Sequence, residues 1–280
     1  MEVIGFGGAG CKIAKGFERH TQYNVHYIDV GISGQNCYKL PRSKTIERAE
    51  ETVPKFSKLT HAIKENKTFF ICAGSRVTSG AILRTLEQIK EAEVTLIYIR
   101  PDLSFLNEEE TKREKVTYRI LQEFARSGLL ERMCIIDNAC VAEILGDLSI
   151  VEYFSKINHA LTNTLHMINY LNESDSIIGN VCDTKETNRV STVSAYNLDK
   201  NQEKPYFLME NIREKHFYFA LNQQTLEKEK GMLKKIKAQV KKAGQSGQTS
   251  VSYDVTATTY EENFAYIVSH TNFIQGEKNS

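Results

Sequence analysis

The chain has 280 residues, a hydrophobic share of 41% and a charged share of 25%. These values exclude a short peptide module and a mainly disordered chain. The chain has 36 lysine and arginine residues and 35 aspartate and glutamate residues. Its net charge is therefore too small to attract nucleic acid or anionic lipid over the whole surface. The six cysteines form no CxxC pair, and no apolar run approaches the roughly 20 residues that cross a bilayer. We expect a cytoplasmic protein with no metal site built from side chains, no membrane association and no direct contact to nucleic acid.

The first half of the sequence alternates strands and helices. Apolar runs predict strands at residues 2–6, 24–29, 68–72, 94–99 and 133–136, and the periodicity between them predicts helices at residues 12–20, 80–92 and 108–126. Near-continuous apolar strands separated by helices are typical of a parallel sheet covered on both faces. The prediction for residues 1–147 is therefore an α/β domain built on a parallel sheet.

The second half begins with a long amphipathic helix. From Ile150 to Leu171, apolar residues recur every three or four positions, which predicts a connecting helix over residues 148–172. Beyond it, strands are expected at residues 189–196, 216–221, 249–258 and 264–271, with one helix at 226–243. This mixture predicts a smaller α+β domain over residues 173–280.

A glycine-rich turn, Gly5-Phe6-Gly7-Gly8-Ala9-Gly10, separates the first strand from the first helix. Such a turn leaves backbone N–H groups free to face an anion, and the helix dipole adds a favourable potential, so a phosphate site is expected here. The same glycines satisfy GxGxxG, and Asp29 ends the next strand where a dinucleotide fold holds its ribose carboxylate. Three interpretations stay open on these residues: a nucleotide phosphate loop, an NAD site, and a tight turn without a ligand.

Further segments carry a family resemblance. Residues 5–12 closely resemble the first nucleotide loop of the tubulin/FtsZ superfamily. Residues 71–81 resemble a degraded form of that family's glycine-rich signature loop, which follows a strand and opens a helix. Pro101, ahead of the acidic residues 108–110, sits where the family has its ribose-contacting loop.

The later segments continue in the order of the same family. Residues 136–138 resemble the strand end whose asparagine reads guanine, and residues 154–159 resemble the start of the central helix. Residues 180–186 resemble the loop that reaches the nucleotide of the next subunit in family filaments. A dinucleotide fingerprint alone does not explain these segments in this order.

The resemblance implies GTP or GDP as the cofactor, with Mg²⁺ held through phosphates and water. Arg76 stands where the family loop allows close approach to phosphate, and its guanidinium would offset the lost glycines. His159 stands where the family commonly has an acidic residue beside the base. The implied nucleotide-binding residues are Gly7, Gly8, Ala9, Gly10, Cys11, Lys12, Gly74, Ser75, Arg76, Thr78, Ser79, Gly80, Glu108, Asn138, Asn158 and His159.

The resemblance also implies a catalytic pair. Family filaments use acidic groups three residues apart to polarise water at the neighbouring subunit's terminal phosphate. Asp183 and Glu186 keep this spacing but are displaced by one position, since the positions in register with Asn180 hold Cys182 and Lys185. Cysteine and lysine do not act as the base at neutral pH, so we expect Asp183 and Glu186 to be catalytic.

The function that the resemblance implies is a filament-forming, tubulin-like GTPase that assembles head to tail with itself. The short segment after Phe273 resembles compact phage or plasmid members, whose filaments position DNA. The implied partners are then a DNA-associated adaptor or a capsid/DNA cargo, in the host cytoplasm if a phage encodes the chain. The alternatives are a nucleotide-binding assembly protein without hydrolysis and an NAD-dependent reductase.

Overall fold

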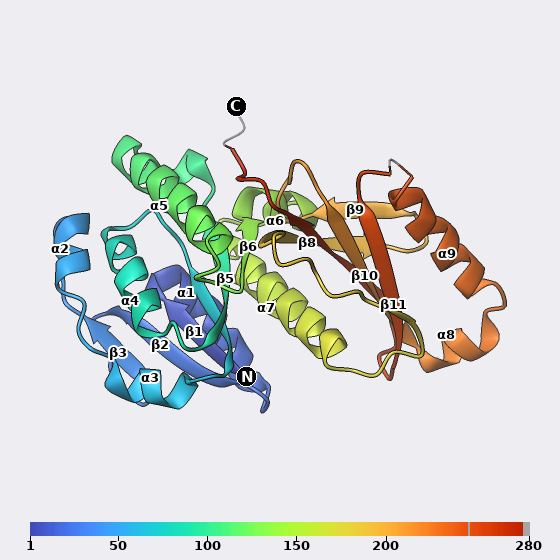
Figure 1. Ribbon diagram of the computed structural model, residues 1–280, viewed down its shortest axis with the longest axis horizontal. Coiled ribbons are helices and arrows are strands. Elements are labelled where there is room, and N and C mark those ends of the chain that lie inside the picture. Colours follow the sequence, from blue (N-terminus) through green and yellow to red (C-terminus); the bar gives the residue numbers. More distant parts are fainter. Residues whose placement is uncertain (246, 277–280) are drawn as a thin grey trace. The chain divides into compact units, whose positions relative to one another are not determined.

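The computed structural model describes residues 1–245 and 247–276, without the side chain of Asn180 (Figure 1). The chain divides into two compact units, one from Met1 to Thr162 and one that begins at Asn163. This division falls inside the long helix α7 (Tyr153–Asn172), whose 20 residues begin five positions after the start of the helix expected at residues 148–172 and end at the same residue.

The first unit is built on a six-stranded sheet in which all neighbouring strands run parallel. The strand order is β3-β2-β1-β4-β5-β6. The strands are β1 (Glu2–Phe6), β2 (Asn24–Val30), β3 (Cys37–Leu40), β4 (Lys67–Cys72), β5 (Glu93–Arg100) and β6 (Arg132–Asp137). The chain winds outward from β1 to β3 and then returns to lay β4 on the other side of β1. In sheets of this kind, ligands bind outside the carboxyl ends of the two strands where the order reverses, here β1 and β4.

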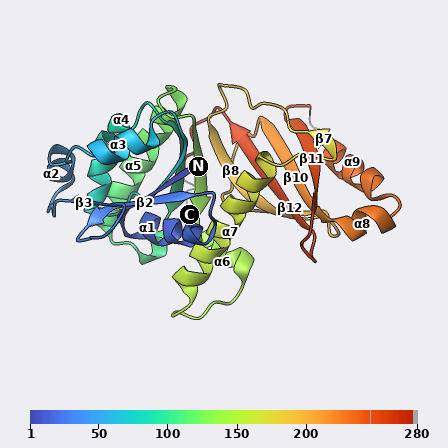
Figure 2. The ribbon, with the colours of Figure 1, turned by 90° about the horizontal axis from the view of Figure 1, so that it is seen from below.

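The helices of the first unit cover both faces of its sheet. Figure 2 shows α3, α4 and α5 on one side of the strands and α1 on the other. Right-handed crossovers on either side of the reversal produce this arrangement. The helices are α1 (Gly7–Lys15), α2 (Ile46–Glu51), α3 (Ser57–Ile63), α4 (Ile82–Gln88), α5 (Glu108–Arg126) and α6 (Asn138–Leu145), with 3-10 turns η1 (Gly16–Arg19), η2 (Val77–Ala81) and η3 (Leu103–Phe105).

The bounds of α1 and α4 differ from those expected. Helix α1 begins at Gly7, five residues before the expected Lys12, because the glycine turn itself is the first helical turn. The helix expected at residues 80–92 is a 3-10 turn followed by α4, which ends at Gln88. For α5 the expected bounds are confirmed, since a capping box between Asn107 and Glu110 fixes its start.

The second unit contains a mixed sheet in the order β8-β12-β10-β11-β7, with β9 paired to the outer side of β8. Strands β10 and β11 run parallel, and the other neighbours run antiparallel. The strands are β7 (Ile178–Asn180), β8 (Val190–Asn197), β9 (Gln202–Pro205), β10 (Glu214–Asn222), β11 (Ser250–Thr258) and β12 (Phe264–Thr271). This is the α+β pattern expected from the sequence.

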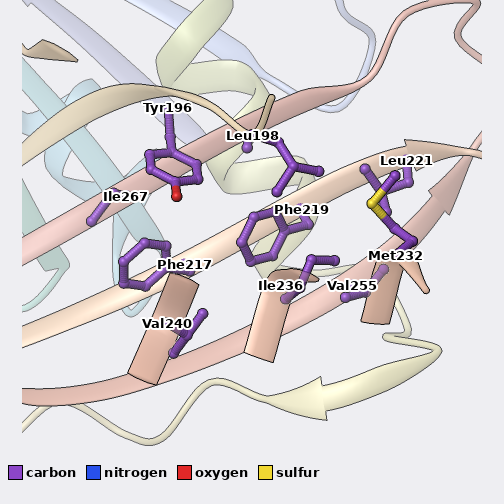
Figure 3. Close-up of a cluster of buried hydrophobic side chains, with 11 residues drawn as sticks. Tyr196, Leu198, Phe217, Phe219, Leu221, Met232, Ile236, Val240, Val255 and Ile267 are labelled. Carbon is purple, nitrogen blue, oxygen red and sulfur yellow. The ribbon is translucent and has the colours of Figure 1, made fainter. Parts of the chain in front are cut away.

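One face of this sheet carries α8 (Gln223–Lys228) and α9 (Met232–Ala243). Met232, Ile236 and Val240, spaced four apart on α9, pack onto aromatic and aliphatic side chains of the sheet, including Phe217 and Phe219 (Figure 3). The prediction of a single helix over residues 226–243 is wrong, because two helices, α8 and α9, occupy this segment. Gly231 has a φ of 102°, a conformation that breaks the helix and that glycine adopts readily.

Candidate functional site

The turn between β1 and α1 requires glycine for two separate reasons. All five residues of β1 are buried, so the strand carries the chain through the core to Gly7, whose φ is 68°. A Cβ at Gly10 would clash with the backbone carbonyl of Ile71 on β4. The first turn of α1 therefore packs directly on β4, and this close contact between backbones requires glycine.

The amino end of α1 presents free donors. Phe6 occupies the N-cap position, and the first turn consists of glycines and Ala9, so side chains provide no hydrogen-bond acceptor there. Gly8 and Ala9 are exposed. The helix dipole places positive potential at this end, and Lys12 and Lys15 lie in the last turn, where they suit the opposite end of the dipole. The arrangement can bind an anion through backbone N–H groups.

The loop after β4 faces this turn. The hydroxyl Oγ1 of Thr78 lies 3.7 Å from the point where a Cβ on Gly7 would stand. Together with the glycines, Thr78 therefore borders the space outside the carboxyl ends of β1 and β4. Both glycine-containing loops thus meet at the reversal of the strand order, which the sequence alone could not demonstrate.

Helix α5 fixes the rest of this second loop. The Arg113 guanidinium donates to the Ser75 carbonyl at 3.0 Å, and the Thr117 hydroxyl donates to Ser79 Oγ at 3.4 Å. Ser75 and Ser79 are buried, and a Cβ on Gly74 would clash with the Tyr98 hydroxyl. These contacts shape the loop, and of its hydroxyls Thr78 is the one that faces the glycine turn.

Two charged residues expected at the nucleotide, Arg76 at the phosphates and Glu108 at the ribose, are paired on the surface. The Arg76 guanidinium lies 3.0 Å from Glu110 Oε1, and its side chain is 79% exposed. Glu108 pairs with Lys112 one turn along α5 at 2.6 Å. For Arg76 to contact a phosphate, it must first leave Glu110, so its expected role stays a prediction.

An amide lies at the end of β6, where a base contact was expected. Asn138 is the first residue of α6, and its Oδ1 is buried without a hydrogen-bond partner among the described residues. Asp137 caps the same helix by accepting from the Ala139 N–H at 2.9 Å, and burial raises the pKa of its carboxyl. An orphaned buried amide oxygen costs about 1–3 kcal/mol, which a ligand that donates a hydrogen bond would recover.

Asn158 and His159, expected on α7, lie one helical turn before Thr162, which joins α7 to α1. The Asn158 carbonyl accepts from the Thr162 hydroxyl at 2.9 Å, and Thr162 also donates to the Ile13 carbonyl at 3.1 Å. His159 is exposed, and its Nδ1 lies 3.4 Å from the Arg19 guanidinium. Their contact with a base stays a prediction.

Cys11 and Asp29 lie beside the glycine turn. The Cys11 thiol donates to the Gly5 carbonyl at 3.2 Å, and burial, together with the nearby Asp29 carboxylate, raises its pKa to about 12. Cys11 is therefore a neutral thiol and supplies no nucleophile. Asp29 Oδ1 accepts from the Val30 N–H at 2.7 Å, and its other oxygen lies 3.9 Å from where a Cβ on Gly8 would stand.

The expected catalytic pair lies on an anchored loop of the second unit. Asp183 and Glu186 are both exposed between β7 and β8. The buried Glu214 carboxylate at the start of β10 accepts from the Lys185 N–H at 3.3 Å and from the Asn188 amide at 2.6 Å. These anchors leave the two acidic side chains free while they fix the backbone that carries them.

A ligand of the kind expected fits the first unit. The glycine turn and the uncapped amino end of α1 would hold the phosphates of a nucleotide. The unpaired Oδ1 of Asn138 would accept a hydrogen bond from its base. Among the described residues, no group of three or more His, Cys, Asp or Glu could hold a metal ion. Within the described ranges, no helix has the length and apolar character to cross a membrane.

Sequence comparison finds no matching protein-family model and no matching curated protein. By structure, the chain is similar to an empty FtsZ dimer from M. jannaschii, with a TM-score of 0.71, 13% identity, and coverage of 96% of this chain and 87% of that one. It is also similar to TubZ from Bacillus thuringiensis serovar israelensis in a GTPγS-form protofilament, with a TM-score of 0.71, 14% identity, and coverage of 95% and 86%. The chain has the tubulin/FtsZ fold.

A type III plasmid segregation TubZ is similar in the same way, with a TM-score of 0.68, 15% identity, and coverage of 96% of this chain and 87% of that one. The tubulin/FtsZ fold thus extends over nearly the whole chain, as the order of motifs in the sequence predicted.

Several residues near the site escaped the sequence analysis. Arg42 and Ser43 follow β3 and line a cavity of about 360 Å³ beside Thr78. The available signal was the short strand-like run from Cys37 to Leu40, which ends at a proline. Glu214 was missed because its partner, the Lys185 N–H, is 29 residues away and is a backbone group.

Proposed function

We infer that this chain binds GTP at the β1–α1 turn and assembles head to tail into filaments. The observation that supports this most strongly is the glycine turn itself, because Gly10 has room only for hydrogen and the helix that follows has an uncapped amino end. A turn under this constraint, at the reversal of a parallel sheet, suits a phosphate group. The fold likeness to TubZ in GTPγS-form and GDP-form protofilaments supports guanine nucleotide and filament together.

Hydrolysis is proposed to need two subunits. Asp183 and Glu186 are exposed and fixed to the second unit, so they are available to the nucleotide of another copy. A carboxylate that orients water at a Mg²⁺-bound terminal phosphate would act as the base. The interface is heterologous and does not close, so subunits add along a line, and nucleotide at each joint controls its stability.

The cargo of the filament is proposed from the fold likeness alone. The similar TubZ is described as a type III plasmid segregation protein. A filament that positions or segregates DNA through an adaptor would also suit a chain with a net charge of +1, since the chain itself has no global field for nucleic acid. We propose the cytoplasm as its location.

Light scattering and negative-stain microscopy test the assembly. The wild-type chain should scatter and form filaments with GTP and Mg²⁺, and neither without nucleotide nor with GDP. Assembly that is independent of nucleotide would contradict the coupling. Polymers that form without phosphate release would reject the GTPase activity and would favour a nucleotide-binding assembly protein that does not hydrolyse GTP. A chain that binds NAD and does not bind GTP would reject the whole proposal.

A pair of loop variants tests the catalytic assignment in the same assay. Asp183→Ala should still assemble with GTP but release phosphate at least about 100-fold more slowly, as expected when a general base is removed. Lys185→Ala is the matched control, because it leaves the backbone N–H that Glu214 holds. If Lys185→Ala is the slow variant, the one-position displacement of the acidic pair is wrong.

A further inference from the structure

The positive charge of the second unit is concentrated in one place. Residues 163–280 contain 14 basic and 14 acidic side chains, and half of the basic ones are the seven lysines of residues 228–242. That segment has a single acidic residue, Glu229. Helix α9 itself carries lysines and no acidic residue. The second unit is therefore neutral as a whole but strongly basic along α9, which the net charge of the chain does not reveal.

The packing of α9 fixes which of its side chains face outward. Its apolar side enters the hydrophobic cluster on the sheet (Figure 3). The amide of Gln239 accepts from the Tyr196 hydroxyl at 2.9 Å and donates to the Leu198 carbonyl at 2.8 Å. These contacts hold the helix in one rotation about its axis, so the opposite side presents a constant surface.

Lys234, Lys237 and Lys241 form a row along this outward side, which we call the lysine row. They are exposed, and spacings of three and four residues place them on the same side of the helix. At a rise of 1.5 Å per residue the row is about 10 Å long. Among the described residues these three lysines form no ion pair, whereas the neighbouring Lys235 pairs with Asp199 at 2.7 Å.

The lysine row is unfavourable for the helix by itself. Like charges three or four residues apart repel one another on a helix surface. Lys234 also lies in the first turn, which has no acidic residue and where the positive end of the helix dipole disfavours a cation. A helix that only needed a solvated surface would be more stable with acidic residues in some of these positions. A row of bound anions would remove both penalties.

The surroundings of the row indicate which polyanion it fits. Protein interfaces are poor in lysine and depend on buried aromatic or apolar anchors, and Leu233, 36% exposed, is the large apolar residue that α9 exposes. The apolar side of α9 is used in the core, so it is not available for insertion into a lipid surface. Helix α9 has no aromatic residue on which single-stranded bases could stack. Lysines alone contact phosphates and read no bases, which fits the backbone of a duplex.

We propose that the lysine row binds the phosphate backbone of duplex DNA without reading its sequence. The expectation of no direct contact to nucleic acid was drawn from the net charge of +1, which averages over the whole surface. With three contacts, one chain binds a duplex weakly. A head-to-tail filament repeats the row, so the contacts of many subunits add along one duplex, and this last step rests on the proposed function.

Fluorescence anisotropy of a labelled short duplex, titrated with the full chain without nucleotide, tests the row by itself. Between about 50 and 200 mM salt, the logarithm of the association constant should fall against the logarithm of salt concentration with a slope of about −3, one unit for each phosphate that is neutralised. Lys237→Ala should weaken binding severalfold and change the slope to about −2. Lys237→Arg should retain both values, because it keeps the charge. Two duplexes of unrelated sequence should bind equally.

Lys235→Ala is the matched control, because it removes the same charge from the same helix at a lysine that is paired with Asp199. It should leave the slope at about −3. Circular dichroism should show that Lys237→Ala unfolds at the wild-type temperature or above it, since the substitution removes two like-charge neighbours. A slope that Lys237→Ala leaves unchanged, or one that Lys235→Ala lowers equally, would overturn the proposal. Tighter binding to polyglutamate, or to vesicles of equal parts phosphatidylserine and phosphatidylcholine, than to the duplex at the same salt would overturn it as well.

A second titration, with GTP and a long duplex, tests the row in the filament. Wild-type chain should bind the long duplex more tightly with GTP than without it, and a variant with alanine at all three positions of the row should not. Filaments that bind no more tightly than the free chain would contradict the addition of contacts along one duplex. If the chain binds no GTP while the salt slopes are as expected, the proposed function fails and the lysine row stands. If filaments form and Lys237→Ala has the wild-type slope, the lysine row fails and the proposed function stands.

Discussion

At the scale of single residues, Gly8 and Gly10 of the same turn have different roles. Gly10 faces the core, where the Ile71 carbonyl leaves no room for a side chain. Gly8 is exposed, has an ordinary φ, and has Asp29 Oδ2 as the nearest atom to its missing Cβ, at 3.9 Å. Gly8 can therefore be substituted without disturbing the packing of α1 on β4. This difference separates the structural role of the turn from its binding role.

Substitutions at these two glycines should have opposite signatures. Gly8→Asp should retain the wild-type free energy of unfolding within about 1 kcal/mol but abolish GTP binding, because a carboxylate would stand at the anion site. Gly8→Ala, its control, should retain both. Gly10→Ala should lower the free energy of unfolding by about 1–3 kcal/mol or more, through overpacking. Urea unfolding and nucleotide titration measure the two effects, and wild-type GTP affinity in Gly8→Asp would contradict the phosphate site.

Glu214 offers a second test at this scale. Glu214→Gln should loosen the loop of Asp183 and Glu186, since the carboxylate holds the Lys185 N–H and the Asn188 amide. Hydrogen exchange of the Lys185 amide should accelerate about tenfold, as expected for the loss of a hydrogen bond to a charged group. Glu203→Gln, which removes the charge beside Lys215 instead, is the control. Equal exchange in both variants would show that Glu214 does not anchor the loop.

At the scale of elements, the sequence predicted the buried strands and α5 well and the short segments poorly. The bounds of β1, α5 and β12 are confirmed, because continuous apolar runs and a capping box are local signals. The unexpected elements, α2, α3, α6, β3, β7 and β9, have three to eight residues each. Segments of this length depend on tertiary packing, as the contact of Ile46 with Gly80 illustrates.

Strand β11 contains an unusual row of polar residues. Asp254, Thr256 and Thr258 share one face of the strand and are buried, and each has a side-chain oxygen without a hydrogen-bond partner among the described residues. The opposite face of β11 carries Val255, which packs in the core with α9. Burial raises the pKa of the Asp254 carboxyl to about 6, so the folded state prefers its neutral form.

This raised pKa predicts a pH dependence of stability. Between the ordinary pKa of about 4 and the folded value of about 6, the folded chain binds the proton more tightly, so this contribution to the unfolding free energy falls as pH rises and is lost above that window. Asp254→Asn should remove this dependence, which amounts to about 1.5 kcal/mol between pH 5 and pH 8, and should stabilise the chain at pH 8. Urea unfolding at pH 5 and pH 8 measures it, and an unchanged difference in the variant would contradict the assignment.

At the scale of the whole molecule, the fold could be predicted from the order of motifs, whereas the fine structure of the site could not. The glycine turn and the loop before Ser79 can be recognised from the sequence alone. The structural similarity to FtsZ and TubZ extends over 95% or more of the chain. The contact of Gly10 with Ile71, the pairing of Arg76 with Glu110 and the cavity beside Arg42 join residues far apart in sequence. Such contacts leave no periodic signal, which explains why Arg42 was missed.

We propose that the nucleotide held by one copy is hydrolysed with the loop of the next, and an experiment that mixes two variants tests this directly. Gly8→Asp subunits keep the acidic loop and lose the phosphate site, and Asp183→Ala subunits keep the phosphate site and lose the base. Each alone should release almost no phosphate from GTP. An equimolar mixture should recover a substantial fraction of wild-type phosphate release, because an intact pocket then meets an intact loop at some joints. Copolymers that stay as inactive as either variant alone would contradict the shared site.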